Sequence, residues 1–167
     1  MQSTTNALEI LRMQHDEVED MIEKIEESDD PREKEMLFAI LADNLAAHAT
    51  IEEKLFYPAV MTMKTHEQLI EATEEHLAVK RLIADMLSMP GDDDHFDAKL
   101  TVIKENLRHH AHDEEEDKLF PIVEKMMNED ELAALGNEMI AMFELLMEQE
   151  PRRNVPAETA EAAQLPM

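Results

Sequence analysis

The sequence has no cysteine and no tryptophan, and among its 167 residues are only 2 glycines, 5 phenylalanines and 1 tyrosine. Without cysteine, thiolate catalysis, disulfides and cysteine-ligated clusters are excluded. Scarce aromatic and β-branched residues disfavour strands, whereas Leu, Ala, Glu, Lys and Met are good helix formers. We therefore expect an all-α fold.

Basic residues are also few, since 15 Lys and Arg stand against 40 Asp and Glu, a net charge of −25. This charge repels phosphate backbones and anionic headgroups, so we expect neither nucleic acid nor membrane as a partner. No run approaches the ~20 apolar residues that span a bilayer. The first residues lack the basic and apolar regions of a signal peptide, so we expect a cytoplasmic protein.

Apolar residues recur at three- and four-residue spacing in five segments, which predicts five helices. The predicted spans are residues 6–28, 31–63, 65–89, 94–127 and 128–149. The capping signals are Thr4, Thr5 or Asn6 for the first helix, Asp30 with Pro31 for the second, Thr65 with Gln68 for the third, and Asn128 with Glu131 for the fifth.

Short connections between the first four helices predict an antiparallel up-down-up-down four-helix bundle over residues 1–127. The helix at 128–149 is then an accessory element. Its apolar stripe must be buried, either against the outside of the bundle or against a second copy of the chain. We expect a symmetric homodimer. Residues 150–167 lose apolar periodicity and are rich in Pro, Ala, Gln and Glu, so we expect a disordered tail.

A repeated motif carries the chemistry. The second helix reads HATIEEKLFYP from His48, and the fourth reads HDEEEDKLFP from His112. Both place Glu four residues after His and Leu-Phe seven and eight residues after it. A lone histidine precedes each motif, His15 by 33 residues and His76 by 36 residues. The chain therefore contains two copies of one unit.

Residues four apart lie on one face of a helix, so a histidine nitrogen and a carboxylate can reach the same metal ion. One such pair could arise by chance in a Glu-rich chain, but two copies with matching downstream residues favour a metal site. The predicted ligands are His15, His48, Glu52, His76, His112 and Glu116.

Some alternatives compete with this ligand set. His109 and His110 stand close to His112, and His110 also has a glutamate, Glu114, four residues later. Only His112 keeps the distance to Leu-Phe that His48 shows, so His112 is preferred. Tyr57 could be a ligand or a redox group, but its apolar neighbours favour packing.

These motifs resemble the haemerythrin-like family, also called the haemerythrin HHE cation-binding domain, over roughly residues 6–127. The resemblance implies an all-α, haemerythrin-like bundle in which two iron ions, bridged by the two carboxylates and an oxo or hydroxo group, are held by histidines. Oxygen carriers of the family have another histidine one turn beyond the third-helix ligand, where this chain has Lys80. Two open coordination positions then follow, with Glu19 or water as candidates to complete them, which disfavours reversible oxygen carriage.

The resemblance implies a non-haem di-iron protein that binds or processes a small oxidant, namely peroxide, oxygen or nitric oxide. Whether it turns over peroxide or nitric oxide as an oxidoreductase stays open. The alternative is an iron-sensing or iron-handling module without turnover. Some bacterial relatives also dock inside protein shells as cargo through a C-terminal tail, although most disordered termini have no such role.

Overall fold

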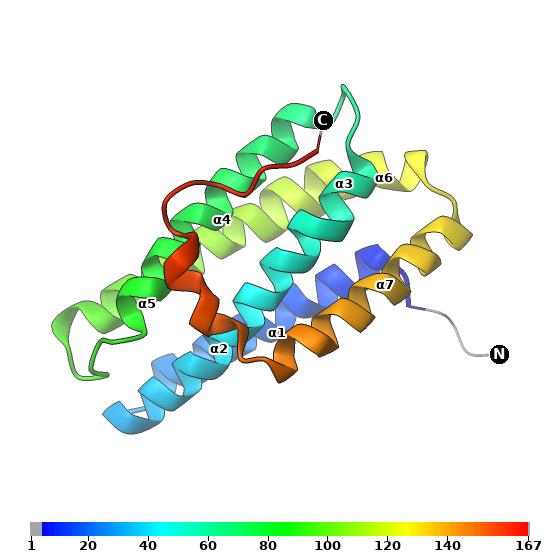
Figure 1. Cartoon of the computed structure of the whole chain (residues 1–167). Coiled ribbons are helices and arrows are strands. Elements are labelled where there is room, and N and C mark those ends of the chain that lie inside the picture. The colour runs from blue at the N-terminus through cyan, green and yellow to red at the C-terminus, as the bar shows by residue number, and fades with distance from the viewer. Residues whose placement is uncertain (1–4, 167) are drawn as a thin grey trace.

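The computed structural model describes residues 5–166, which form helices joined by short turns and contain no strand. Four helical rods make up the bundle, and two of them are interrupted by wider π-helical turns (Figure 1). The rods are α1 (Ala7–Glu27); α2 (Pro31–Ile51) continued by the π-helical η1 (Glu52–Phe56) and α3 (Tyr57–Val60); α4 (His66–Met86); and α5 (Asp94–Arg108) continued by the π-helical η2 (His109–Leu119) and α6 (Phe120–Met126). The all-α, antiparallel four-helix bundle predicted from the sequence is confirmed.

The helices begin where most capping signals predict. The Asn6 side chain accepts a hydrogen bond from a backbone N–H three residues on, at 2.9 Å. Asp30 caps α2, whose first residue is Pro31. Asn128 and Glu131 form a reciprocal capping box at the start of α7 (Glu129–Glu148). These short polar side chains satisfy backbone N–H groups that have no partner within the helix.

Two capping candidates have a different outcome. The predicted Thr65 and Gln68 box is wrong, because the Thr65 side chain makes no capping hydrogen bond to α4. Its hydroxyl donates to Val60 O at 2.8 Å and accepts from Thr62 N at 2.9 Å. Thr65 therefore closes the turn between α3 and α4. Thr4 lies outside the described residues.

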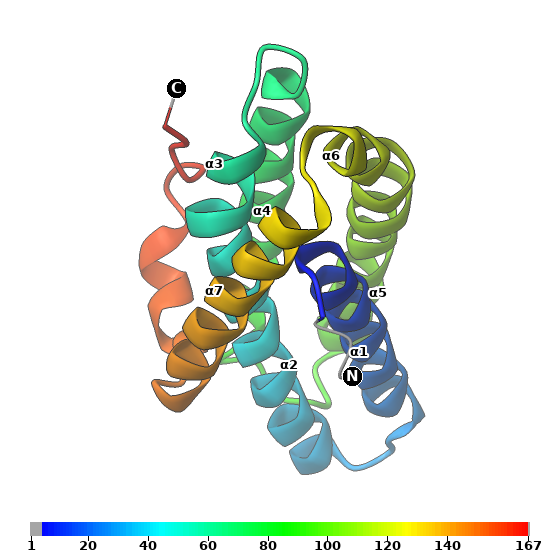
Figure 2. The same cartoon turned by 90° about the vertical axis from the view of Figure 1, so that its right-hand side faces the viewer.

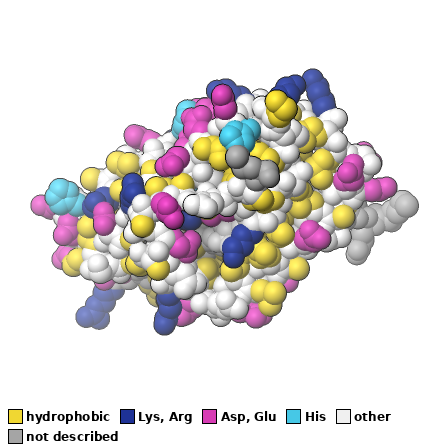
Figure 3. Space-filling view, turned by 45° about the horizontal axis from the view of Figure 1, so that its top comes forward, with side chains coloured by type: hydrophobic (Ala, Val, Ile, Leu, Met, Phe, Trp, Pro, Cys, Tyr) yellow, Lys and Arg dark blue, Asp and Glu magenta, His cyan; other side chains and the backbone are white. Residues whose placement is uncertain are grey.

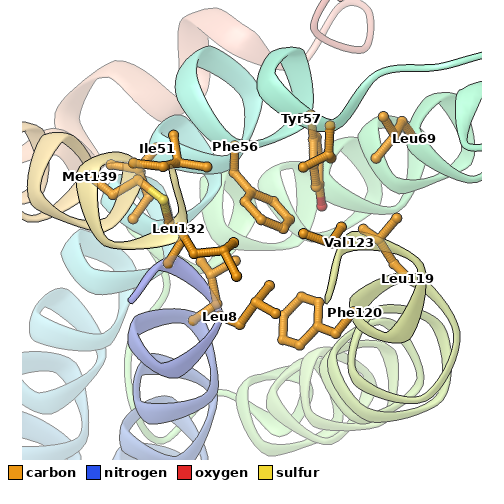
Figure 4. Close-up of a cluster of buried hydrophobic side chains, with 14 of the residues drawn as sticks. Leu8, Ile51, Phe56, Tyr57, Leu69, Leu119, Phe120, Val123, Leu132 and Met139 are labelled. Carbon is orange, nitrogen blue, oxygen red and sulfur yellow. The ribbon is translucent and has the colours of Figure 1, made fainter. Parts of the chain in front are cut away.

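Two apolar clusters occupy opposite ends of the bundle. The first, drawn in Figure 4, joins the α1 start, α3, α6 and α7. The second joins the far halves of α1, α2, α4 and α5. The first cluster includes Leu8, Phe56, Tyr57, Phe120, Leu132 and Met139, and the second includes Ile22, Ile25, Phe38, Leu41, Phe96 and Ile103.

The α7 helix packs against α1 and α2 of its own chain, as Figures 1 and 2 show. Leu132, Leu135 and Met139 are buried there, so the apolar stripe that motivated a dimer is largely covered within the chain. Gly136 permits the close approach, because a Cβ at this position would lie 2.9 Å from the Ala7 nitrogen. The accessory helix thus shares a core with the bundle.

Residues 150–166 pack on the bundle, whereas the sequence predicted a disordered tail at 150–167, whose last residue lies outside the described residues. Glu150 takes a left-handed φ of 50° and turns the chain out of α7. A 3-10 helix, η3 (Pro151–Glu158), then crosses α2 and α4, visible as the red segment in Figure 1. Val155 is 1% exposed and Leu165 is 8% exposed. The sequence signal failed because single buried side chains, rather than a periodic stripe, hold this segment.

On the face drawn in Figure 3, acidic side chains are scattered rather than gathered in one patch. Within residues 5–166, no helix combines the length and the apolar character needed to cross a bilayer.

Candidate metal centre

Each of the two π-helical segments ends two residues before a proline. Proline lacks a backbone N–H, and its ring clashes with the carbonyl four residues earlier. For Pro58 that residue is Lys54 in η1, and for Pro121 it is Asp117 in η2. A wider π turn relieves this conflict, and such turns often occur at functional sites. Both segments carry buried glutamates that point into the bundle: Glu52 in η1 and Glu115 in η2.

A first group of donor atoms comes from all of the rods except α4. His15, His48, Glu52 and Glu115 are buried, and one ligand atom from each lies within 4.8 Å of the others. His15 Nε2 is 3.2 Å from Glu115 Oε1, and His48 Nε2 is 3.2 Å from Glu52 Oε1. Two imidazoles and two carboxylates therefore face one small volume, as a metal ion requires.

A second group, with its atoms equally close, consists of Glu52, His76 and His110. His76 Nε2 lies 3.0 Å from Glu52 Oε1 and 3.2 Å from His110 Nε2. Glu115 Oε1 is also 3.1 Å from His110 Nε2. Glu52 thus belongs to both groups, and Glu115 stands between His15 and His110.

The donor atoms meet the requirements of bound cations. His15 Nε2, His48 Nε2, Glu52 Oε2 and Glu115 Oε1 are buried without a hydrogen-bond partner among the described residues. Histidine and carboxylate atoms lie near one another in these groups but are not all aligned for hydrogen bonds. Unpaired buried polar atoms cost free energy, and coordination of a cation compensates for it. The residues present therefore fit a metal centre.

Each of the four histidines uses its other ring nitrogen to contact an oxygen atom. An Nδ1–H that donates to such an oxygen leaves Nε2 free to bind a metal, and the contact fixes the orientation of the ring. The Nδ1 contacts are His15 to Glu116 at 2.7 Å, His48 to Gln14 at 2.6 Å, His76 to Glu53 at 2.7 Å, and His110 to Glu75 at 3.0 Å.

Tyr57 brings a hydroxyl group to the second group of donors. Its oxygen donates to Glu115 Oε2 at 3.1 Å and lies 3.4 Å from His76 Nε2 and 3.3 Å from His110 Nε2. Burial and the nearby glutamates raise the pKa of Tyr57 well above its usual value, so the phenol keeps its proton. The sequence argument favoured packing for this residue, and the structure adds a polar contact to that packing.

The buried charges compensate one another when only protons are bound. Burial alone would lower the pKa of His15, but Glu115 and Glu116 outweigh burial and raise it to about 9. The pKa of His110 is likewise raised well above its usual value despite burial, mainly through Glu115. Burial opposes the ionised form of Glu52, yet His48 and other neighbours hold its pKa well below the usual value. A metal ion must displace histidine protons, so its binding releases protons.

The structure brings together four of the six predicted ligands, His15, His48, Glu52 and His76. The other two, His112 and Glu116, lie outside the buried groups, with side chains 37% and 20% exposed. Glu116 instead contacts His15 Nδ1, and His112 contacts Glu19. The places predicted for these two residues are taken by His110 and Glu115.

This correction has a physical reason. The sequence argument matched His112 to His48 by their distance to Leu-Phe, which assumes the same helical geometry in both rods. The η2 segment spans 11 residues and η1 only 5, so the second rod departs from α-helical geometry over a longer stretch. The signal that could have found the pair is a His-Glu spacing of five just before Phe120-Pro121.

Lys80 lies one turn beyond His76 and belongs to neither group of donor atoms. Lys80 Nζ is 3.2 Å from Glu53 Oε1 and 3.4 Å from Glu158 Oε1. Lys80 therefore supports Glu53, the oxygen partner of His76, and links it to the C-terminal segment.

A cavity of about 40 Å³ adjoins the four imidazoles. His15, His48, His76 and His110 line it, whereas Glu52 and Glu115 do not. Most of the remaining walls are apolar, formed by residues such as Val18, Leu45, Val79, Ile83, Leu107 and Val155. Three charged side chains, Glu19, Glu75 and Lys80, also line the cavity. The cavity thus lies on the side of the imidazoles away from the two carboxylates.

Comparisons with known proteins agree with the helical fold and with a cation-binding domain. A solved hemerythrin HHE cation binding domain-containing protein from Mycobacterium kansasii superposes with a TM-score of 0.76 and 27% identity, over 92% of this chain and 94% of that one. A curated relative from Nostoc sp., named DNA nickase, is 23% identical over 136 residues. That match covers 81% of this chain but 38% of the relative, so this chain corresponds to a minor part of it.

Residues 6–123 match the Hemerythrin HHE cation binding domain family. The match covers the first three rods, most of the fourth, and all six residues of the two donor groups. The buried histidine and glutamate groups and the bundle that positions them are what a cation-binding domain of this kind requires. The chain therefore belongs to the hemerythrin HHE cation-binding domain family.

Proposed function

We propose that this protein is a non-haem di-iron protein that binds or processes a small oxidant: peroxide, oxygen or nitric oxide. His15 and His48 would hold one iron, and His76 and His110 the other. Glu52 and Glu115 would bridge the pair. The observation that carries this proposal is the membership of Glu52 in both groups of donor atoms.

The donor set favours iron over zinc. A structural zinc site is closed by four ligands in a tetrahedron, often with cysteine, and this chain has none. Two adjacent groups of imidazoles joined by carboxylates in a helical bundle are typical of di-iron carboxylate proteins. Iron, when bound, supplies the redox chemistry that a small oxidant requires.

The residues of the chain position the donor atoms, exclude water from them and hold protons near them. The Nδ1 contacts hold each imidazole in place, so that the donor atoms need little rearrangement to bind metal. Glu52 is fully buried and Glu115 is 2% exposed, which keeps bulk water from the bridging carboxylates. The Tyr57 hydroxyl donates a hydrogen bond to Glu115 and so helps to orient this carboxylate.

The DNA nickase activity named for the cyanobacterial relative is not part of this proposal. The shared region is a minor part of that protein. A net charge of −25 also opposes contact with a phosphate backbone.

Metal analysis with an optical spectrum of the freshly purified protein tests the proposal, before and after addition of hydrogen peroxide. We expect about two irons per chain and a spectrum that changes on peroxide addition. Glu129→Ala, on the exposed side of α7, is the matched control for the purification. Two irons with no response to peroxide, oxygen or nitric oxide would favour an iron-handling module, and zinc or no metal would contradict the proposal.

A further inference from the structure

The cavity beside the imidazoles is large enough for a small molecule. Roughly 10–15 Å³ of such space holds one water molecule, so about 40 Å³ accommodates two or three waters or one molecule of two to four heavy atoms. The charged side chains on its walls already have partners: Glu19 contacts His112, Glu75 contacts His110, and Lys80 pairs with Glu53. The rest of the wall is apolar, so entry of a further charged group is costly. The chemistry therefore suits a small uncharged molecule.

One wall of this cavity comes from a segment outside the four rods. Val155 belongs to η3, is 1% exposed, and packs with the second apolar cluster. The η3 segment crosses the seam between α2 and α4, the rods that carry His48 and His76 (Figure 1). A buried side chain of the C-terminal segment thus forms part of the cavity wall where this segment covers the seam.

Polar contacts fasten the C-terminal segment on both sides of the seam. On α2, Asp43 accepts hydrogen bonds from Arg152 Nη1 at 2.7 Å and from Arg152 N at 3.0 Å. On α4, Arg81 Nε donates to Thr159 O at 3.0 Å, and Lys80 pairs with Glu158 at 3.4 Å. These contacts hold η3, and with it the Val155 side chain, in place over the seam between α2 and α4.

We propose that the C-terminal segment is a working part of the site, in which Val155 closes the cavity and sets the size of the molecule that can reach the imidazoles. Arg152 is a positioning residue that acts through Val155. The selected class is an uncharged molecule the size of hydrogen peroxide, dioxygen or nitric oxide, and organic hydroperoxides with bulky substituents are excluded. The inference deepens the proposed function and, for its chemical readout, rests on it.

A xenon experiment tests the closure without reference to activity, because small apolar cavities bind xenon. Crystals of the wild type and of the Val155→Ala and Val155→Phe variants are pressurised with xenon, and its occupancy is measured by diffraction. We expect xenon beside the four imidazoles in the wild type, higher occupancy in Val155→Ala and none in Val155→Phe. Val102→Ala, at a position 44% exposed on α5, is the matched control and should resemble the wild type. Equal occupancy in wild type and Val155→Ala would contradict the closure.

A kinetic experiment on the iron-loaded protein tests size selection. The rates of reaction with hydrogen peroxide and with cumene hydroperoxide are compared, with iron content measured in the same samples. Since a methylene-sized change in a pocket alters discrimination by about 10-fold or more, Val155→Ala should reduce the preference for hydrogen peroxide by about 10-fold at unchanged iron content. Arg152→Ala should reduce it less, and Val102→Ala not at all. An unchanged preference in Val155→Ala and Arg152→Ala would overturn the inference. A protein that purifies without iron would contradict the proposed function. The xenon experiment would then be the test of whether Val155 closes the cavity.

Discussion

The two halves of the bundle hold equivalent pairs of histidine and glutamate with different spacing. In the first half His48 and Glu52 are four residues apart, and in the second His110 and Glu115 are five apart. Each glutamate also reaches the lone histidine of the other half. Glu52 Oε1 is 3.0 Å from His76 Nε2, and Glu115 Oε1 is 3.2 Å from His15 Nε2. Neither half can therefore assemble a complete site alone.

The two halves also differ in the residues that contact the Nδ1 atoms of the histidines. His48 is held by the neutral amide of Gln14, whereas the other three histidines contact carboxylates. A carboxylate acceptor increases the basicity of a metal-bound imidazole more than an amide does. The two halves thus share a ligand plan but differ in helical geometry and in local charge.

The largest expected effect comes from Glu52, the residue that belongs to both donor groups. Glu52→Ala should abolish the paired site, because each group loses a ligand, and should lower the free energy of unfolding by about 3–5 kcal/mol, the usual cost of breaking a buried ion pair. Iron content and thermal unfolding measure the two effects. Two irons and a wild-type melting curve in this variant would show that Glu52 does not join the halves.

The second prediction separates the two candidate motifs in the fourth rod. His110→Ala should lose at least one of the two irons, whereas the matched change His112→Ala should keep both, because His112 lies outside the donor groups. Metal analysis of the two variants gives the answer directly. The reverse result would restore the ligand set predicted from the motif repeat.

A smaller effect is expected from the contacts that orient the histidines. Glu53→Gln replaces the carboxylate that contacts His76 Nδ1 and should weaken metal binding by about 10- to 100-fold, as loss of such partners usually does. Competition with a chelator measures the affinity. Glu74→Gln on the exposed face of α4 is the control. If both variants bind metal equally well, the Glu53 contact does not tune the site.

The smallest predicted change is Tyr57→Phe, which removes the hydroxyl and leaves the packed ring. Loss of one hydrogen bond to Glu115 should lower the free energy of unfolding by about 1 kcal/mol, with two irons retained. Chemical denaturation and metal analysis are the measurements. Loss of an iron would instead identify the hydroxyl as a ligand.

Much of the architecture was predictable from local signals. Asn6, Asp30 and Asn128 mark helix starts through side chains that satisfy nearby backbone groups, and apolar periodicity marks the faces that become the core. His15, His48, Glu52 and His76 were identified because they lie in regular α-helix or immediately after it. There, spacing along the chain reports position in space.

The remaining features depend on contacts that local signals do not encode. His110 and Glu115 replaced the predicted pair because the long π segment η2 changes which residues face the bundle interior. Burial of the α7 stripe depends on a close approach at Gly136. The C-terminal segment is held by single contacts to distant residues, such as Arg152 to Asp43.

By itself, the sequence determined that the chain is helical, acidic and built from a repeated histidine and glutamate unit. These properties depend on composition and on the spacing of residues within a few turns of one helix. The tertiary structure alone decided which histidine and which glutamate of the second unit face the first, and that the C-terminal segment contributes a wall of the cavity. The physical reason is that a donor group is defined by distances between atoms on different helices. Those distances are fixed only when the helices pack.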